Sequence, residues 1–164
     1  MKEIPLTQGK VALVDDADAA IVAPYKWYAS RHRGTFYART DTGGRLVRRR
    51  LAMHRVILGL GAGDGREVDH INGNGLDNRR ANLRICTHAE NLRNRGPQRN
   101  NRSGYKGVSL HPDGKWTAHI SINGSRNVRY LGLFSTPEDA ARAYDAAARD
   151  LFGEYARLNF PDRA

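Results

Sequence analysis

Strict alternation of apolar and polar side chains marks one segment near the middle of the second half of this chain. The apolar positions of that segment are Trp116, Ala118, Ile120 and Ile122. The polar positions are Lys115, Thr117, His119 and Ser121. A period of two predicts a strand that buries one face and leaves the other exposed. Segments 105–111 and 127–134 flank it across Pro-Asp-Gly and Asn-Gly turn signals, so the pattern predicts a three-stranded antiparallel sheet.

A helix is predicted directly after this sheet. Pro137 stands at a first helical position after Thr136, two acidic residues follow it, and Gly153 marks the end. The apolar stripe of the helix consists of Ala140, Tyr144, Ala148 and Leu151. Alanines allow a helix to lie close to its neighbour, so we expect this helix to cover the apolar face of the sheet. The polar face would then remain uncovered.

The first half carries shorter patterns. A strand is predicted at 10–14, a short helix within 15–25, and a hairpin of 27–33 and 35–41, followed by a third strand at 46–53. Farther along, strands at 68–71 and 83–86 enclose an Asn-Gly turn cluster. A helix then begins at Thr87, with Glu90 completing a capping box. This strand–loop–strand–helix segment is too short to bury a core alone.

A polar segment without periodicity, RNRGPQRNNRS at 93–103, separates the two halves. We therefore predict an α+β chain with a first domain at 1–95, whose small core is 66–95, a basic linker at 96–103, and a second domain at 104–161. The charged residues of the linker segment are all arginines. A spacer would need only solubility, so we interpret the linker as a strap along a phosphate backbone.

Charge favours a polyanionic partner. Lys and Arg number 27 against 17 Asp and Glu, which gives a formal net charge of +10. A field of that sign attracts nucleic acid, although a merely soluble basic protein would also carry it. The run Arg48, Arg49 and Arg50 is interpreted as a phosphate contact, with a solvated strand face as the alternative.

The remaining composition restricts the class of protein. The only cysteine, Cys86, excludes an internal disulfide and a multi-cysteine zinc site. No apolar run approaches the roughly 20 residues that span a bilayer, so we expect no membrane partner and a cytoplasmic location.

Three residues around the Asn-Gly turn have the chemistry of a metal-assisted site. Asp69 offers an anionic oxygen and Asn91 an amide oxygen, and both suit Mg²⁺, which keeps several waters and substrate phosphates. His70 can take a proton from water near neutral pH. Neighbours on a strand point to opposite faces, so Asp69 and His70 can serve one site only where the strand ends or bulges.

These residues resemble the HNH, or ββα-metal, nucleases, in particular their homing-endonuclease branch. The resemblance rests on Asp69-His70-Ile71-Asn72-Gly73-Asn74, then Asn78 through Asn82-Leu83, then Asn91. It implies that His70 is the general base, that Asp69 and Asn91 hold one divalent metal (Mg²⁺ or Mn²⁺), and that Asn82 pins the loop and so positions His70.

Other interpretations of these side chains stay open. Asp69, Asn78 and Asn82 could merely satisfy turn backbones, which is the favoured reading for Asn78. His88 is interpreted as a solvated histidine, with a phosphate or metal contact as the alternative. His54 is interpreted as a packing residue or a phosphate contact.

The second half resembles the ethylene-response-factor (Apetala-type) DNA-binding domain over residues 105–161. The residues that carry the resemblance are Tyr105-Lys106-Gly107-Val108, Lys115-Trp116, Tyr130-Leu131-Gly132-Leu133-Phe134, the alanine-rich helix 140–148, and Leu158-Asn159-Phe160-Pro161. The resemblance implies that the sheet enters the major groove of double-stranded DNA. The predicted DNA contacts on this half and the linker are Arg95, Arg99, Arg102, Lys106, Ser109, Lys115, Thr117, His119, Ser121 and Tyr130.

The expected target differs from that of the plant members. Ser109, His119 and Ser121 stand where plant factors usually have Arg or Glu, so their GC-rich target is not carried over. By parity Tyr130 joins the polar face, while Arg129 points the other way.

Together these patterns predict a sequence-directed, metal-dependent DNA endonuclease, a hydrolase of phage or mobile-element homing type, or a nickase, in the cytoplasm of a bacterial host. No small-molecule substrate is expected. The alternative is a catalytically silent DNA-binding transcriptional regulator whose HNH fold is a scaffold, and a third reading is an RNA-binding module. The intact set Asp69, His70 and Asn91 favours the nuclease. The target sequence, the mode of cleavage and the oligomeric state stay open.

Overall fold

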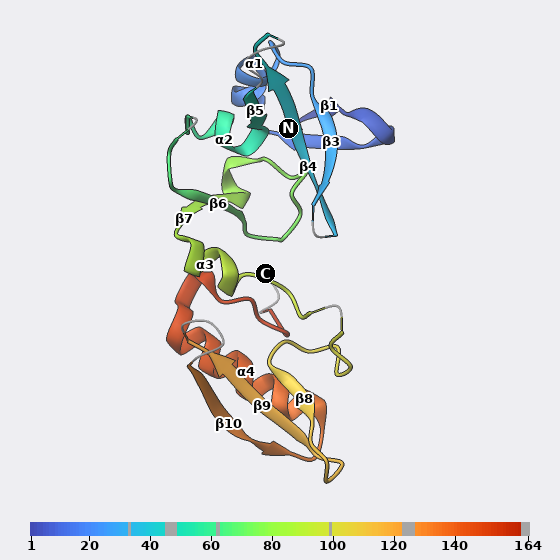
Figure 1. Cartoon of the computed structure of the whole chain (residues 1–164), viewed down its shortest axis with the longest axis vertical. Coiled ribbons are helices and arrows are strands. Elements are labelled where there is room, and N and C mark those ends of the chain that lie inside the picture. Colours follow the sequence, from blue (N-terminus) through green and yellow to red (C-terminus); the bar gives the residue numbers. More distant parts are fainter. Residues whose placement is uncertain (33, 45–48, 62, 99, 123–126, 162–164) are drawn as a thin grey trace. The chain divides into compact units, whose positions relative to one another are not determined.

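A computed structural model describes residues 1–32, 34–44, 49–61, 63–98, 100–122 and 127–161. The chain divides into two compact units, Met1–Thr87 and His88–Ala164. All paired strands of the described residues are antiparallel, apart from one isolated parallel bridge, and short helices accompany them (Figure 1). The α+β class is therefore confirmed. No helix in these ranges has the length and apolar character that crossing a membrane requires.

Unit 1 is built from short strands and helical turns. Its strands are β1 (Lys2–Pro5), β2 (Val11–Val14), β3 (Tyr28–His32), β4 (Thr35–Thr42), β5 (Arg49–Ala52), β6 (Glu67–His70) and β7 (Leu83–Cys86). Its helices are α1 (Ala19–Val22) and α2 (Met53–Ile57), with 3-10 turns at Thr7–Gly9, Asp16–Asp18 and Arg80–Asn82. The predicted hairpin is present as β3–β4, and β5 extends it to three strands, although residues 45–48 lie outside the described ranges.

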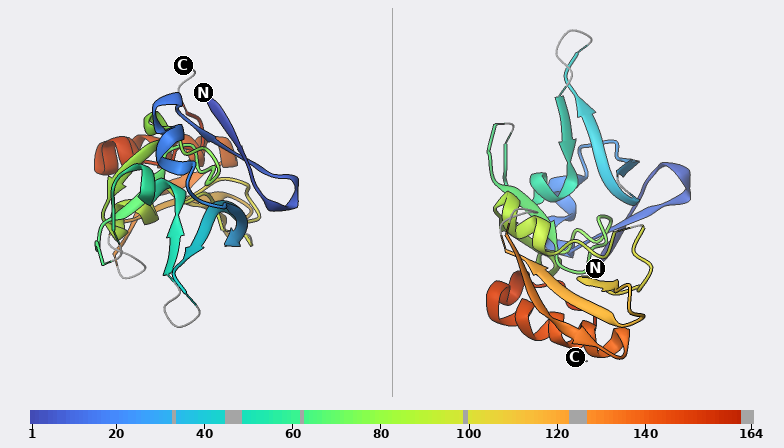
Figure 2. Two further views of the ribbon diagram at one scale, coloured as in Figure 1. Left: turned by 90° about the horizontal axis from the view of Figure 1, so that it is seen from above. Right: turned by 60° about the horizontal axis from the view of Figure 1, so that its bottom comes forward.

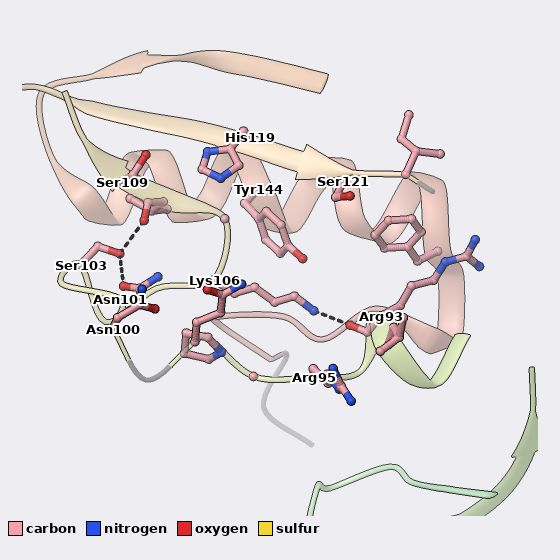
Figure 3. A pocket seen from close by; sticks show the side chains of 18 of the residues that line it. Arg93, Arg95, Asn100, Asn101, Ser103, Lys106, Ser109, His119, Ser121 and Tyr144 are labelled. Atoms are coloured by element: carbon pink, nitrogen blue, oxygen red, sulfur yellow. Dashed lines mark hydrogen bonds between the residues drawn. The ribbon is translucent and has the colours of Figure 1, made fainter. Parts of the chain in front are cut away.

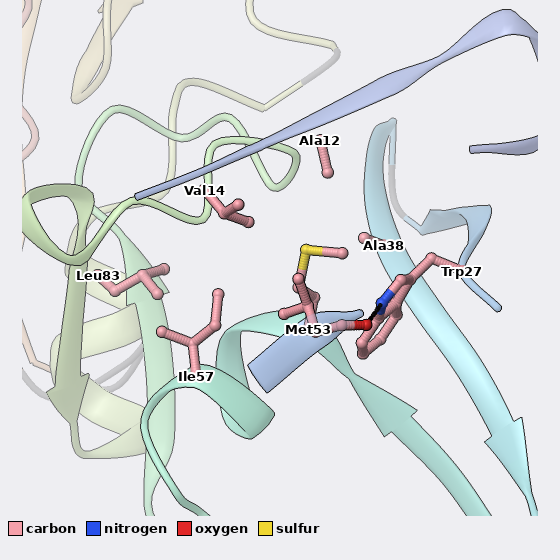
Figure 4. Close-up of a cluster of buried hydrophobic side chains, with 8 residues drawn as sticks. Ala12, Val14, Trp27, Ala38, Met53, Ile57 and Leu83 are labelled. Carbon is pink, nitrogen blue, oxygen red and sulfur yellow. Dashed lines mark hydrogen bonds between the residues drawn. The ribbon is translucent and has the colours of Figure 1, made fainter. Parts of the chain in front are cut away.

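The core of unit 1 joins segments far apart in the sequence. Its buried members are Ala12, Val14, Val22, Trp27, Ala38, Met53, Ile57 and Leu83 (Figure 4). Trp27 is held in place because its indole Nε1 donates a 2.9 Å hydrogen bond to the Val22 carbonyl. Leu83 of β7 belongs to this cluster, so the β6–β7 hairpin is anchored on the rest of the unit rather than on its own few residues.

Unit 2 contains the predicted sheet and helix. Its elements are α3 (His88–Arg93), β8 (Val108–Leu110), β9 (Trp116–Ser121), β10 (Val128–Phe134), α4 (Pro137–Phe152) and a 3-10 turn at Gly153–Tyr155. The strand order is β10-β9-β8, and α4 lies along one face of this sheet (Figures 1 and 2). The boundary between the two units lies before α3, whereas the sequence predicts a first domain that ends at residue 95. The predicted domain limits stay a prediction.

Small side chains bring α4 close to the sheet. Ala118 and Ile120 of β9 are 0% and 1% exposed, and Ala140 and Ala148 of α4 are both 0% exposed. Thr136 caps the helix by accepting a 3.2 Å hydrogen bond from the Asp139 amide, as Pro137 at the first turn predicts. The predicted stripe is correct except at its end, where Phe152 is buried and Leu151 only half-buried.

Asp145 joins α4 to the C-terminal segment. This carboxylate is 2% exposed and accepts hydrogen bonds from the amides of Asn159 and Phe160, each 2.8 Å long. The Asn159 side chain in turn accepts from the Lys106 amide at 2.7 Å and donates to the Lys106 carbonyl at 3.1 Å. A buried charge that accepts several hydrogen bonds is satisfied, so the helix, the C-terminal segment and the start of β8 form one network.

Gly107 marks the closest approach of the backbone to α4. A Cβ there would lie 2.1 Å from the Tyr144 ring and 2.7 Å from the His119 carbonyl oxygen, and φ is +75°. We expect Gly107→Ala to destabilise unit 2 by about 1–3 kcal/mol through overpacking and by roughly 1–2 kcal/mol more through the left-handed backbone. Urea unfolding of the full chain measures this difference.

Gly114→Ala is the matched control, because φ there is +77° and a Cβ would meet nothing within 4 Å. It should show only the backbone cost. Equal losses in the two variants would contradict the packing argument.

Candidate nucleic-acid interface

The face of the β8–β10 sheet opposite α4 gathers most of the strand residues predicted to bind DNA. The register aligns Ser109 with Thr117 and Leu133, His119 with Tyr130, and Ser121 with Val128. We call these seven residues the open face. Arg129 pairs with Ile120, whose side chain is buried toward α4, so Arg129 points away from the open face as parity predicts.

Most side chains of the open face are small or apolar. The hydroxyls of Ser109 and Thr117 are 2.8 Å apart and hydrogen-bond each other. Tyr130, Val128 and Leu133 are 62%, 51% and 38% exposed. Val128 and Leu133 were missed by the sequence reasoning, which looked for polar and basic groups. Parity would have found Val128; Leu133 joins this face only because the register shifts between Tyr130 and Gly132.

Residues 94–103, which we call the arm, are tied to unit 2 at both ends. At the first end, the Lys106 ammonium donates to the carbonyl of Arg93, the last residue of α3. At the second end, Asn101 donates to the Tyr105 carbonyl at 2.8 Å and Ser103 to the Val108 carbonyl at 2.9 Å. The arm is therefore closed into a loop with fixed ends, unlike a free spacer.

A cavity of about 950 Å³ lies between the arm and the β8–β9 part of the open face. Ser109, His119 and Ser121 line one side, and Arg95, Asn100 and Asn101 of the arm line the other (Figure 3). Four basic residues contribute to the lining: Arg93, Arg95, Arg102 and Lys106. Among the described residues that line it, none is acidic. A cavity with such a lining favours an anionic occupant.

The basic residues of unit 2 that are predicted to contact DNA differ in exposure and in hydrogen bonding. Burial, and secondarily the charge of Arg157, lower the pKa of Lys106 to about 8, and its ammonium is bound to a carbonyl, so this lysine positions the arm. Arg95 and Arg102 are exposed on the arm, Lys115 is exposed just before β9, and Arg99 lies outside the described residues.

In unit 1, Arg49 and Arg50 are exposed on β5, and Arg48 lies outside the described residues. The Arg50 guanidinium is paired with Asp41 at 3.2 Å. Arg50 thus has a partner within the strand pair β4–β5.

The β6–β7 hairpin of unit 1 holds the motif residues in a dense polar network. β6 ends at His70, as the sharing of one site by Asp69 and His70 would require, and both residues are buried. The Asp69 carboxylate is bound by the Arg84 guanidinium at 2.7 Å. Asn82 donates to the Asp77 carbonyl at 2.8 Å and accepts from the Asn72 amide at 2.9 Å, and thus spans the loop between the strands.

His70 lies in a buried aromatic cluster. Its ring centroid is 5.0 Å from that of His54 and 5.7 Å from that of Tyr37, and its Nε2 lies 3.4 Å from the Asn78 Oδ1 atom. Burial lowers the pKa of His70, while Asn78 and two nearby aspartates oppose the shift. Burial lowers the pKa of His54 to about 3, so His54 is a neutral packing residue at physiological pH.

One of the two predicted magnesium ligands has a protein partner in this structure. The Asp69 carboxylate already neutralises Arg84, and the described residues contain no group of three His, Cys, Asp or Glu side chains that could hold a metal. Asn91, the other predicted ligand, belongs to unit 2, as does His88. The roles of Asp69, His70, Asn82 and Asn91 in catalysis and metal binding stay predictions.

Two family models match separate parts of the chain. Residues 103–154 match the AP2 domain, and residues 51–93 match the HNH endonuclease model. Among curated proteins, ethylene-responsive transcription factor ERF010 of Arabidopsis thaliana is 52% identical over 58 residues, which are 35% of this chain and 32% of the relative. ERF017 of the same plant is 50% identical over 60 residues, 37% of this chain and 32% of the relative.

A third relative is a plant protein with a different name. Dehydration-responsive element-binding protein 2A of Arabidopsis thaliana is 40% identical over 70 residues, which are 43% of this chain and 21% of the relative. The chain thus spans about a third or less of the length of these three curated relatives.

These relatives overturn the endonuclease prediction. They are named as transcription factors and as an element-binding protein of plants. The expected phosphodiester hydrolysis, the phage or mobile-element homing role and the cytoplasm of a bacterial host are therefore wrong, and the alternative of a DNA-binding transcriptional regulator is favoured. The motif residues also serve the hairpin itself, Asp69 through Arg84 and Asn82 through the Asp77 carbonyl, so an intact motif is compatible with a structural role as well as with catalysis.

The comparisons agree with the geometry of unit 2. A three-stranded antiparallel sheet covered on one face by a single helix, with the other face open, occupies the segment that the family model matches. Residues 103–154 are similar to the AP2 domain, and this similarity supports double-stranded DNA as the partner.

Proposed function

We propose that this protein is a catalytically silent transcriptional regulator that binds duplex DNA through the open face of β8–β10. The observation that carries the proposal is the one-sided cover of this sheet: α4 buries one face and leaves the other to the solvent. A β-sheet can enter the major groove and present its side chains to base edges. The likeness to ethylene-responsive transcription factors supports the same use of this face.

The arm supplies the sequence-independent part of the binding in this proposal. Arg95 and Arg102 are exposed on it, and the cavity that it encloses shares Ser109, His119 and Ser121 with the open face. The arm thus stands at the border of the reading surface, where a phosphate backbone flanking the groove would run. Arginines in such a place neutralise phosphates and release counterions.

Residues 51–93 serve as a scaffold in this proposal. They match an HNH endonuclease model, and their polar side chains hold the β6–β7 loop together through Asn82 and the Asp69–Arg84 pair. Exposed Arg49 on β5 adds a phosphate contact from unit 1.

Selection from a random duplex pool tests the proposed function. The full chain should enrich duplexes that share one sequence motif, because base contacts in the major groove are worth about 1–3 kcal/mol each. A chain with Tyr130→Ala should enrich that motif less strongly, since this exposed side chain lies on the open face. A retained pool without a common motif would contradict sequence-directed binding.

Changing Arg95 and Arg102 together to alanine should flatten the salt dependence of DNA binding. Two lost phosphate contacts lower the slope of log K against log salt by about 2 units and weaken unrelated duplexes alike. Fluorescence anisotropy over a salt series on two duplexes measures the slope.

Arg142→Ala with Arg149→Ala is the matched control, because it removes the same charge from exposed positions of α4, on the covered side of the sheet. Equal slopes for the two double variants would mean that only net charge matters.

Lys106→Met should loosen the arm without unfolding the sheet. The variant keeps the aliphatic stem but loses the bond to the Arg93 carbonyl, and a hydrogen bond from a charged group contributes about 1.5–3 kcal/mol. Amide exchange at 94–103 should then quicken roughly ten- to a hundred-fold, and DNA affinity should fall. Lys115→Met, an exposed lysine outside the arm, is the control for exchange. If amide protection of the arm is unchanged in Lys106→Met, Lys106 does not hold the arm in place.

A further inference from the structure

The open face lacks the side chains that recognise guanine. Arg and Lys bind guanine O6 and N7 in the major groove through paired hydrogen bonds. Among the described open-face positions of β8, β9 and β10, none is Arg or Lys. Arg129 pairs with Ile120 and points away, and Lys115 precedes β9. Base reading by this face therefore depends on other chemistry.

Three exposed apolar side chains occupy one strand of the open face. Val128, Tyr130 and Leu133 are consecutive open-face positions of β10, because the register shift after Tyr130 moves Leu133 onto this face. Their partners on β9, Ser121, His119 and Thr117, are two residues apart. Two residues of a strand span about 7 Å, which equals about two base-pair rises of 3.4 Å. A β10 strand that follows the groove would therefore place one apolar side chain at every second base pair. Among the described residues that line the cavity beside the arm, none belongs to β10.

Each apolar side chain has a hydrogen-bonding neighbour across the strand pair. The three rows are Val128 with Ser121, Tyr130 with His119, and Leu133 with Thr117. An A·T pair displays the matching set in the major groove: the thymine methyl, which is apolar, next to the thymine O4 and adenine N6 and N7 positions. A G·C pair displays no methyl group.

From these rows we infer that β9 and β10 read A·T base pairs, with Val128, Tyr130 and Leu133 contacting thymine methyl groups. The inference rests on the proposed function, since it needs the open face in the major groove. It gives the regulator a thymine-rich target, read at alternating base pairs. Val128 and Leu133 become specificity-determining residues that contact bases through their side-chain methyl groups.

Replacement of thymine by deoxyuridine tests the inference, because it removes the methyl group and keeps every hydrogen-bonding atom of the base pair. The duplex is the one that the full chain enriches from the random pool. Each contacted methyl lost should weaken binding roughly fourfold, and the loss of three should weaken it roughly sixtyfold. Replacement of thymines outside the protected footprint is the control and should change nothing.

Side-chain variants assign the contact to the open face. Val128→Ala and Leu133→Ala should weaken binding to the thymine duplex and reduce its preference over the deoxyuridine duplex. Val11→Ala makes the same change at a valine that is 38% exposed on β2 of unit 1, and should leave that preference intact. Unchanged thermal unfolding of the three variants verifies that the fold is kept.

The outcomes separate the two proposals. A duplex that is bound equally with thymine and with deoxyuridine overturns the methyl contacts and leaves the regulator intact. A preference that survives in Val128→Ala and Leu133→Ala also overturns them. Failure of the chain to bind or enrich any duplex defeats the proposed function itself.

Discussion

Close packing of α4 on the sheet is the constraint on which the DNA-binding unit depends. Ala118, Ala140 and Ala148 are fully buried at this contact, and Gly107 leaves no room for a Cβ beside Tyr144. Small residues let the helix lie close against one face of a short sheet, because a helix with larger side chains would stand farther away. The opposite face then has nothing to bury it and is exposed to a partner.

A series of hydrogen bonds connects this packing to the arm. Asp145 holds the C-terminal segment, Asn159 of that segment holds the backbone of Lys106, and the Lys106 side chain holds the end of α3. Each link is a hydrogen bond that is at least partly buried, where an unsatisfied group would be costly. The arm of ten residues is thereby positioned from the helix through three residues, and its arginines are presented beside the open face.

The hairpin of unit 1 shows how a motif typical of catalysis can serve the fold. Its Asp69 neutralises Arg84, Asn82 binds backbone on both sides of the loop, and buried Asn78 approaches His70. Asn and Asp suit such loops because their short side chains replace missing backbone partners. The same residue types therefore satisfy the pattern of a nuclease motif and the needs of a tight turn, which is why the motif alone misled the functional prediction.

The sequence by itself determined the elements of unit 2. Period-two alternation at 115–122, Pro137 after Thr136 and Gly153 located β9 and α4 almost to the residue, since these signals act within a few bonds of the chain. Only the tertiary structure decided that Leu133 reaches the open face, through a register shift that parity cannot foresee, and that Lys106 locks the arm. Both depend on contacts between segments that are distant in sequence or on an irregular strand pair, and periodicity carries no information about either.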